Sequence, residues 1–164
     1  RQAGHKDPEI YTFYAELQKR FRAIPGVRSV SLSDNPLIAN RASATIVAVS
    51  GTPERQNPLV LTVGPGFFTT LQIPLLRGRE MDDHDRPSLN PVAVVNEAFA
   101  KAAFGDQNPL GQHLNLPLDP VAKREIEIVG VSTNAHYRAL QGDVRPTVYR
   151  KRLRNPSCSR GRTP

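Results

Sequence analysis

Proline and glycine limit the length of every regular element that this chain can form. The 164 residues include 15 prolines and 11 glycines, spread along the whole sequence. Proline lacks a backbone donor and glycine weakens the interior of helices and strands, so both residues tend to end elements. The stretches between them predict short strands and short helices in a chain large enough for one domain or two small lobes.

One helix is predicted near the start of the chain. Asp7 is placed to cap it, Pro8 suits its first position, and Pro25-Gly26 ends it. Its apolar residues recur at spacings of three and four, as expected for one helical face: Ile10, Phe13, Tyr14, Leu17, Phe21 and Ile24.

Residues 27–33, VRSVSLS, alternate between polar and apolar after this helix. The alternation predicts a half-buried strand in which Val30 and Leu32 face the core. A helix joined to a strand by a tight turn resembles half of a βαβ unit. The strand that would precede the helix is not found in this chain.

Short elements are expected through the rest of the sequence. Asn96 is placed to cap a helix in which Phe99 and Ala103 share a face, and Gly105 ends it. The predicted segments are a hairpin of strands at 43–50 and 57–63, one or two helical turns in 64–72, a strand ending at 78, a strand at 92–95, the capped helix, and strands within 108–116, 124–132 and from 146. The order of these predicted strands and helices indicates an α+β fold of short mixed sheets with helices on one face.

The positive charge is concentrated at the end of the chain. The formal net charge is +7, and residues 150–164 carry Arg150, Lys151, Arg152, Arg154, Arg160 and Arg162 without an acid. The rest of the chain is therefore nearly neutral, which argues against a basic nucleic-acid-binding face on the folded part. We expect residues 150–164 to form a disordered tail. Nonspecific nucleic-acid binding by this tail stays an alternative.

The sequence also argues against a cysteine-stabilised protein and against a membrane-spanning or leader segment within these residues. The single cysteine, Cys158, lies in the same basic segment, which excludes an internal disulfide and a cysteine-based metal site. The sequence contains no apolar run long enough to span a membrane and no charged-then-apolar leader, so we expect neither in this segment.

The cluster DDHD is the strongest candidate for chemistry. Asp82, Asp83, His84 and Asp85 could give oxygen and imidazole ligands to a divalent cation, which makes a small metal-dependent enzyme the rival hypothesis. Consecutive ligands in one loop need further ligands from elsewhere, and no metal-binding spacing supplies them. We expect a solvated acidic turn in which Asp82 or Asp83 caps the backbone.

The remaining polar candidates have simpler structural interpretations. Gly64 and Gly66 resemble the start of a dinucleotide fingerprint, but Thr69 occupies the third glycine position, so we expect a strand-to-helix junction whose Phe67, Phe68 and Leu71 fill the core. The histidines are scattered at positions 5, 84, 113 and 136 and are expected at the surface. Glu125 and Glu127 are expected on an exposed strand face opposite Ile126 and Ile128, rather than as paired catalytic carboxylates. No G-x-S-x-G elbow is present, and we expect no catalytic residue, cofactor or metal.

Five ordered blocks resemble the MacB-type periplasmic core domain of bacterial ABC transporter permeases, particularly the large duplicated permeases of acidobacteria. The first block lies in VGPGFFTTLQIPLLRGRE and the last is RPTVY. The matching positions are Val63, Pro65, Phe67, Phe68, Ile73, Pro74, Gly78, Arg79, 92–100, 108–111, 126–131, Arg145, Pro146, Val148 and Tyr149. The resemblance covers residues 8 to 149.

The resemblance implies a non-catalytic extracytoplasmic domain that couples movements of the transporter to substrate or partners outside the membrane. It implies a core domain over residues 1–149, with a porter-like βαβ lobe that is incomplete here, an inserted small α/β lobe at roughly 63–135, and the tail 150–164 as a truncated or frameshifted end. The implied partners are the transmembrane helices of the same permease, its nucleotide-binding domain indirectly, a second copy and a periplasmic adaptor protein, with no nucleic acid. The implied location is the periplasmic side of the inner membrane.

Overall fold

The computed structural model describes residues 7–34, 43–51, 55–82, 84–85, 91–116, 125–136 and 143–151. His5, Asp83, Cys158 and residues 152–164 lie outside the described residues. In chain order the elements are α1 (Asp7–Arg22), β1 (Ser43–Ala44), β2 (Val47–Val49), β3 (Arg55–Gln56), β4 (Leu59–Val63), α2 (Phe67–Leu71), β5 (Leu75–Gly78), β6 (Val92–Asn96), α3 (Glu97–Phe104), β7 (His113–Asn115), β8 (Ile126–Ser132) and β9 (Thr147–Lys151).

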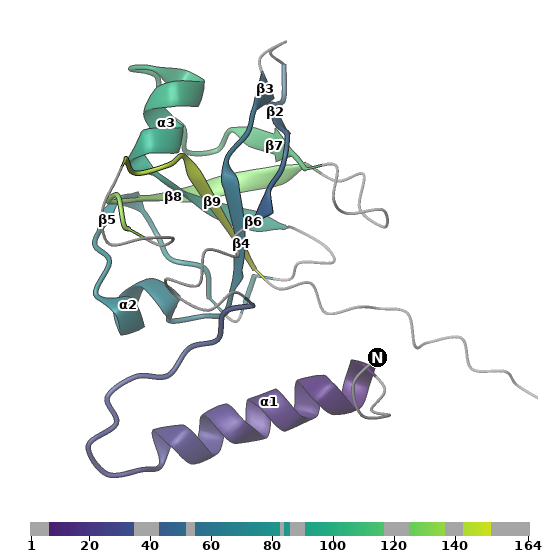
Figure 1. The fold of residues 1–164 in the computed structure, drawn as a ribbon, viewed down its shortest axis with the longest axis vertical. Helices are drawn as coiled ribbons and strands as arrows, with labels where there is room; N and C mark the ends of the chain where they lie inside the picture. Colours follow the sequence, from purple (N-terminus) through teal and green to yellow (C-terminus); the bar gives the residue numbers. More distant parts are fainter. Residues whose placement is uncertain are drawn as a thin grey trace, which may run out of the picture.

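The strands form one mixed sheet that curls back on itself (Figure 1). Its order is β1-β4-β9-β6-β8-β7-β2-β3, and β5 pairs with β8 beside this path. The β4–β9 and β6–β8 pairs are parallel and the other pairs are antiparallel. Because β1 leads directly into β2, and β3 into β4, the two ends of this order belong to the same hairpin. The hairpin predicted for residues 43–63 is thus confirmed, with a short interruption in each strand.

The core lies on both faces of the central strand β6, whose residues are all buried. Val92 and Val94 belong to a cluster with Phe67 and Phe68 of α2. The alternate residues of β6 belong to a second cluster with Phe99 of α3. The α+β class is confirmed, but α2 and α3 cover opposite faces of β6 and not one face as predicted. The physical reason is that a central strand with two apolar faces needs cover on both.

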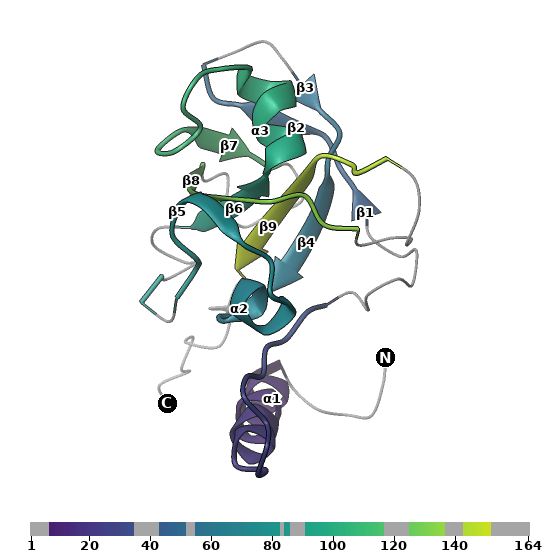
Figure 2. The ribbon, with the colours of Figure 1, turned by 90° about the vertical axis from the view of Figure 1, so that its left-hand side faces the viewer.

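Helix α1 forms as predicted and lies beside the curled sheet, away from its core (Figure 2). The strand predicted for residues 27–33 is mostly wrong, because only Ser33 bridges to Val63. The serine side chains bond elsewhere: Ser31 Oγ donates to the carbonyl of Pro65 at 3.1 Å, and Ser29 Oγ lies 2.6 Å from Thr70 Oγ1. Such side-chain bonds compete with a strand ladder. Val30 and Leu32 are half-buried, in agreement with the predicted inward face.

The other predicted elements are present. Asn96 caps α3 by accepting from Phe99 N, and Gly105 follows its last turn with a φ of 59°. Strand β9 runs through Arg150 and Lys151, the first two residues of the segment that we assigned to the tail. No helix within the described ranges is long and apolar enough to cross a membrane.

Candidate functional site

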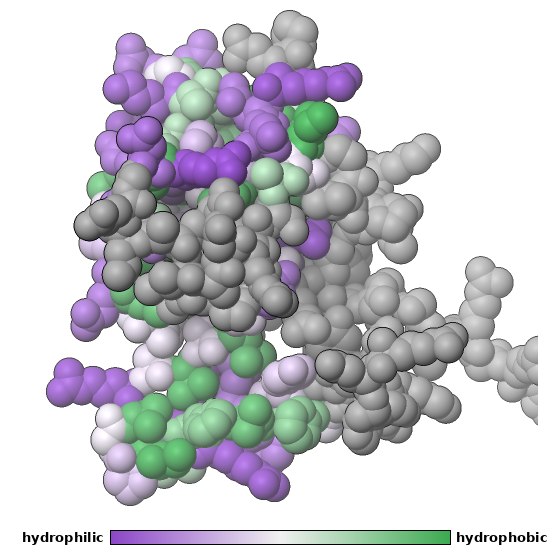
Figure 3. Space-filling model, in the orientation of Figure 1, coloured by the Kyte–Doolittle hydropathy of each residue, from purple (hydrophilic) through white to green (hydrophobic). Residues whose placement is uncertain are grey.

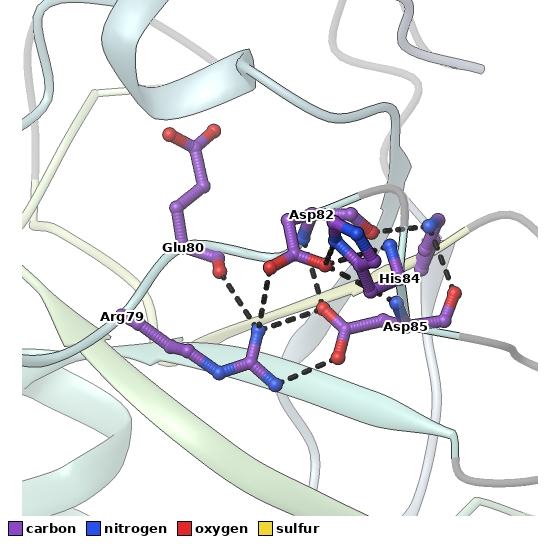
Figure 4. Close-up of polar contacts among 6 residues, drawn as sticks. Arg79, Glu80, Asp82, His84 and Asp85 are labelled. Atoms are coloured by element: carbon purple, nitrogen blue, oxygen red, sulfur yellow. Dashed lines mark hydrogen bonds and ion pairs between the residues drawn. The ribbon is translucent and has the colours of Figure 1, made fainter.

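Asp82, His84 and Asp85, the described residues of the DDHD cluster, lie in a tight turn held by Arg79 (Figure 4). Arg79 lies just after β5, and its Nη1 and Nη2 atoms donate to the two carboxylate oxygens of Asp85 at 2.8 and 2.7 Å. The Asp82 carboxylate accepts from the backbone N–H groups of His84 at 2.8 Å and Asp85 at 3.2 Å. Asp82 therefore caps the turn, which confirms the structural interpretation of the cluster.

Lys151 connects this turn to the end of β9. Its Nζ atom donates to the carbonyl of Asp85 at 2.8 Å and also to the carbonyl of Asp82. The turn, the end of β5 and the last residue of β9 are consequently fastened together by one arginine, one lysine and two aspartates. We call this set, Arg79, Asp82, Asp85 and Lys151, the ionic clamp.

The electrostatics of the clamp favour its charged form. The hydrogen bond from Arg79 lowers the pKa of Asp85, the backbone N–H of Asp82 and the charges of Arg79 and Lys151 lower it further, and partial burial opposes them. The same bond raises the pKa of Arg79. The Asp85 side chain is only 9 % exposed, whereas that of Arg79 is 49 % exposed. The pair therefore keeps its charges at neutral pH while one partner stays in contact with solvent.

The geometry does not gather these groups as metal ligands. Among the described residues there is no group of three or more histidine, cysteine or carboxylate side chains that could hold an ion. Both carboxylate oxygens of Asp85 bond to Arg79, and the His84 side chain is 96 % exposed. What the arrangement does chemically is to fix a loop.

The glycine-rich junction is also occupied by the chain itself. Gly66 takes a φ of 72° immediately before α2, which is a left-handed conformation that suits glycine. Glu80 then reaches the first turn of α2: its Oε1 accepts from Phe68 N at 2.9 Å and its Oε2 from Thr69 Oγ1 at 3.0 Å. Figure 4 shows the Glu80 side chain directed away from the clamp. This cap could not be predicted from the sequence, because no local spacing connects Glu80 with Phe68.

The other sequence candidates lie at the surface. His84, His113 and His136 are exposed, as expected. Glu125, just before β8, and Glu127, within it, are exposed while Ile126 and Ile128 are buried, as the alternation predicted.

A buried asparagine forms the second polar centre. Asn96 is fully buried and its Nδ2 donates to the carbonyl of Arg145 at 2.9 Å. Its Oδ1 accepts from Phe99 N at 2.9 Å and from Thr147 N at 2.8 Å. One side chain thus joins β6, α3 and the start of β9. The cap on Phe99 was predicted from the sequence, whereas the bonds to Arg145 and Thr147 were not.

The polar side chains of the clamp, of Glu80 and of Asn96 all form bonds within the protein, to its backbone or to other side chains. Together with the curled mixed sheet, they define a small α+β scaffold domain. The chain belongs to the family of the MacB-like periplasmic core domain, whose model matches residues 3–151. The predicted resemblance and the periplasmic location that it implied are thereby confirmed.

Solved structures with the same fold include domains of transporters. The periplasmic region of MacB from Actinobacillus actinomycetemcomitans superimposes with a TM-score of 0.60 at 20 % identity, covering 84 % of this chain and 54 % of that one. The extracellular domain of the noncanonic ABC-type transporter YknZ from Gram-positive bacteria gives 0.54 at 16 % identity, covering 83 % and 60 %. A domain of a putative permease from Porphyromonas gingivalis gives 0.53 at 18 % identity, covering 79 % and 52 %.

This chain spans between half and two thirds of the length of each of these structures. A comparison with curated proteins finds no match.

Proposed function

We propose that this chain is a non-catalytic extracytoplasmic domain of an ABC transporter permease that transmits movement between the membrane part of the transporter and substrate or partners outside. The family match over residues 3–151 carries the proposal. The same fold in MacB and in YknZ, an ABC-type transporter, supports it.

The ionic clamp gives the proposal a physical basis. Movement passes through a domain only if its elements move as one body, and bonds across separate strands restrict their relative sliding. The Asp85–Arg79 pair and the Lys151 contacts tie the end of β9 to the loop after β5. A displacement applied at the end of β9 would therefore reach β5 and its partner β8.

The proposed partners follow from this role. They are the transmembrane helices of the same permease, its nucleotide-binding domain through those helices, a second copy and a periplasmic adaptor protein. A domain with this role needs no cofactor or metal. The polar residues of the ionic clamp form hydrogen bonds within the domain.

The test is a distance measurement in the reconstituted permease that carries this domain. Cys158→Ser removes the thiol of this chain, and Lys101→Cys on the exposed side of α3 takes a spin label. Pulsed electron resonance then compares label-to-label distances within the assembled transporter without nucleotide and with ATP plus vanadate. We expect a shifted distance distribution with ATP plus vanadate, and no shift when the nucleotide-binding domain is catalytically inactivated. Identical distance distributions in the nucleotide-free and vanadate-trapped states would contradict the coupling role.

A further inference from the structure

The chain passes from α1 into the sheet domain through residues 29–34, which we call the entry segment. In the space-filling view α1 forms a layer of its own below the sheet, with hydrophobic side chains along its visible face (Figure 3). A movement of α1 relative to the sheet therefore acts first on whatever the entry segment is bonded to. Its contacts with the junction of β4 and α2 include Gly64 N to the carbonyl of Leu32 at 2.8 Å, Ser31 Oγ to the carbonyl of Pro65 at 3.1 Å and Ser29 Oγ to Thr70 Oγ1 at 2.6 Å.

Helix α2 depends on groups outside it for its conformation. It has five residues, far fewer than an isolated helix needs to be stable in water. Gly66 precedes it and Gln72 follows it, both in the left-handed conformation, with φ of 72° and 55°. Gln72 is the one residue other than glycine with a positive φ in the described part of the chain, and this conformation is unfavourable for a residue with a side chain. Packing of Phe67 and Phe68 and bonds from neighbouring segments must therefore hold α2 in place.

Glu80 joins α2 to the ionic clamp. Its carboxylate caps the first turn of α2, where Oε1 accepts from Phe68 N at 2.9 Å. Its carbonyl accepts from Arg79 Nη1 at 3.1 Å, and the same nitrogen donates to Asp85. The clamp consequently positions the backbone of Glu80, and Lys151 extends this chain of contacts to the end of β9.

We propose that α2 is a two-state coupling element, whose bonded conformation is stabilised by the entry segment and by the ionic clamp together. Groups that stabilise the same conformation of one element are linked thermodynamically, so that loosening one of them loosens the other. The entry segment and the end of β9 are thereby connected through α2 and Glu80. This inference rests on the proposed function and deepens it by naming the residues through which movement passes.

The experiment is amide hydrogen exchange of the full chain, followed by nuclear magnetic resonance. Gly64 N–H reports on the entry segment, because it is bonded to the carbonyl of Leu32. Ser50 N–H is the internal reference for general destabilisation, since it donates to the carbonyl of His113 at 2.9 Å, on the side of β2 and β7. We expect Asp85→Asn to raise the exchange rate of Gly64 relative to that of Ser50 by about fivefold or more.

Two further variants separate coupling through α2 from a general loss of stability. Asn96→Ala is the matched control, because it removes bonds to α3 and to the start of β9 without touching α2, and it should leave the ratio of the two rates unchanged. Glu80→Ala removes the connection itself, so Asp85→Asn should have no further effect on the ratio in that background. An unchanged ratio in Asp85→Asn overturns the proposal. So does a rise that persists without the Glu80 carboxylate, or one that Asn96→Ala reproduces.

A reciprocal measurement keeps the proposal testable if Glu80→Ala does not fold. Ser31→Ala loosens the entry segment, and the exchange rate of Phe68 N–H, which reports on the cap from Glu80, should then rise relative to that of Ser50. An unchanged Phe68 rate would show that the entry segment and the clamp each hold only their own loop. That result would remove this route and leave the transporter role to the distance measurement described above.

Discussion

Single residues stabilise this domain in two main ways: by forming charged hydrogen bonds, and by leaving room for close approach of the backbone where a side chain would not fit. Asp85 shows the first effect, since its carboxylate bonds to both terminal nitrogens of Arg79 while its own carbonyl accepts from Lys151. Gly78 and Gly130 show the second, because they lie opposite each other in the antiparallel pair of β5 and β8 and neither position has room for a side chain.

Asp85→Asn should lower the free energy of unfolding by about 1–2 kcal/mol at neutral pH, because a neutral amide replaces a charge-assisted pair whose arginine is half exposed. The folded-state pKa of Asp85 is lowered, so its contribution is present above the unfolded-state pKa and is lost as the pH falls through the folded-state pKa. Urea unfolding of both proteins between about pH 7 and about pH 3 measures this.

The expected result is that the difference between the two proteins shrinks in acid. The exposed Asp106 gives the control, since Asp106→Asn should leave stability unchanged. A difference for Asp85→Asn that stays constant across the pH range would contradict the role assigned to the ionised pair.

Gly78→Ala should destabilise the fold far more than Gly111→Ala. Both glycines have positive φ, 73° and 78°, so both substitutions carry the backbone penalty of about 1 kcal/mol. Only at Gly78 would the added methyl group overlap the carbonyl oxygen of Val129 and the Cα of Gly130, whereas nothing lies near Gly111. We expect a further loss of about 2–3 kcal/mol at Gly78, measured by urea unfolding. Equal losses would show that the close pairing of β5 and β8 is not rigid.

At the scale of elements, Asn96 holds a strand, a helix and a second strand together. Its position between β6 and α3 could be predicted from the sequence, because an apolar strand pattern is followed by an asparagine and then by an amphipathic helix pattern. Its bonds to Arg145 and Thr147 could not be predicted from the sequence, because those residues lie about fifty positions further along the chain.

Asn96→Ala should cost about 2–4 kcal/mol, because it removes the cap of α3 and leaves the N–H groups of Phe99 and Thr147 and a carbonyl without their partner inside the protein. Asn134→Ala is the matched control, since Asn134 also accepts from an α3 N–H, that of Ala98 at 3.0 Å, but is exposed. We expect a loss of at most about 1 kcal/mol there. Chemical unfolding compares the two variants, and similar losses would mean that the cross-strand bonds of Asn96 contribute little.

At the scale of the whole molecule, α1 and the curled sheet are separate in their packing. The buried hydrophobic residues run from Val47 to Tyr149, and the described side chains of α1 contribute none of them. The link between the two parts is residues 23–34, which meet the sheet through the bridge of Ser33 with Val63 and through the bond from Gly64 N to the carbonyl of Leu32 at 2.8 Å.

Removal of residues 1–22 should therefore leave the sheet domain folded, with a cooperative thermal transition within a few degrees of the full chain at a concentration where the full chain is monomeric. The reason is that the deletion removes no buried core residue among those described. Thermal unfolding followed by circular dichroism measures the shift. Loss of the cooperative transition would show that α1 is part of the folding unit.

Both the family and the elements with a strong local pattern could be predicted from the order of the amino acids. Alternation and periodicity predicted β6, α3, β8 and the hairpin, because these patterns depend on neighbouring residues alone. The same local chemistry predicted that Asp82 or Asp83 caps the turn, and the structure shows that Asp82 does so. The family resemblance rested on blocks in a fixed order, and the match over residues 3–151 confirms it.

The contacts between groups far apart in the chain could be seen only once the chain was folded. The bonds of Glu80 to α2, of Lys151 to the turn and of Asn96 to the start of β9 join residues whose separation in the chain carries no periodic signal. The strand predicted at 27–33 does not form for the same reason, since a strand needs a neighbouring strand to pair with. Ser33 bridges to Val63, the last residue of β4, and the chain then continues into the junction at Gly64. Local patterns fix what a segment can form, whereas pairing and burial across the sheet decide what it does form.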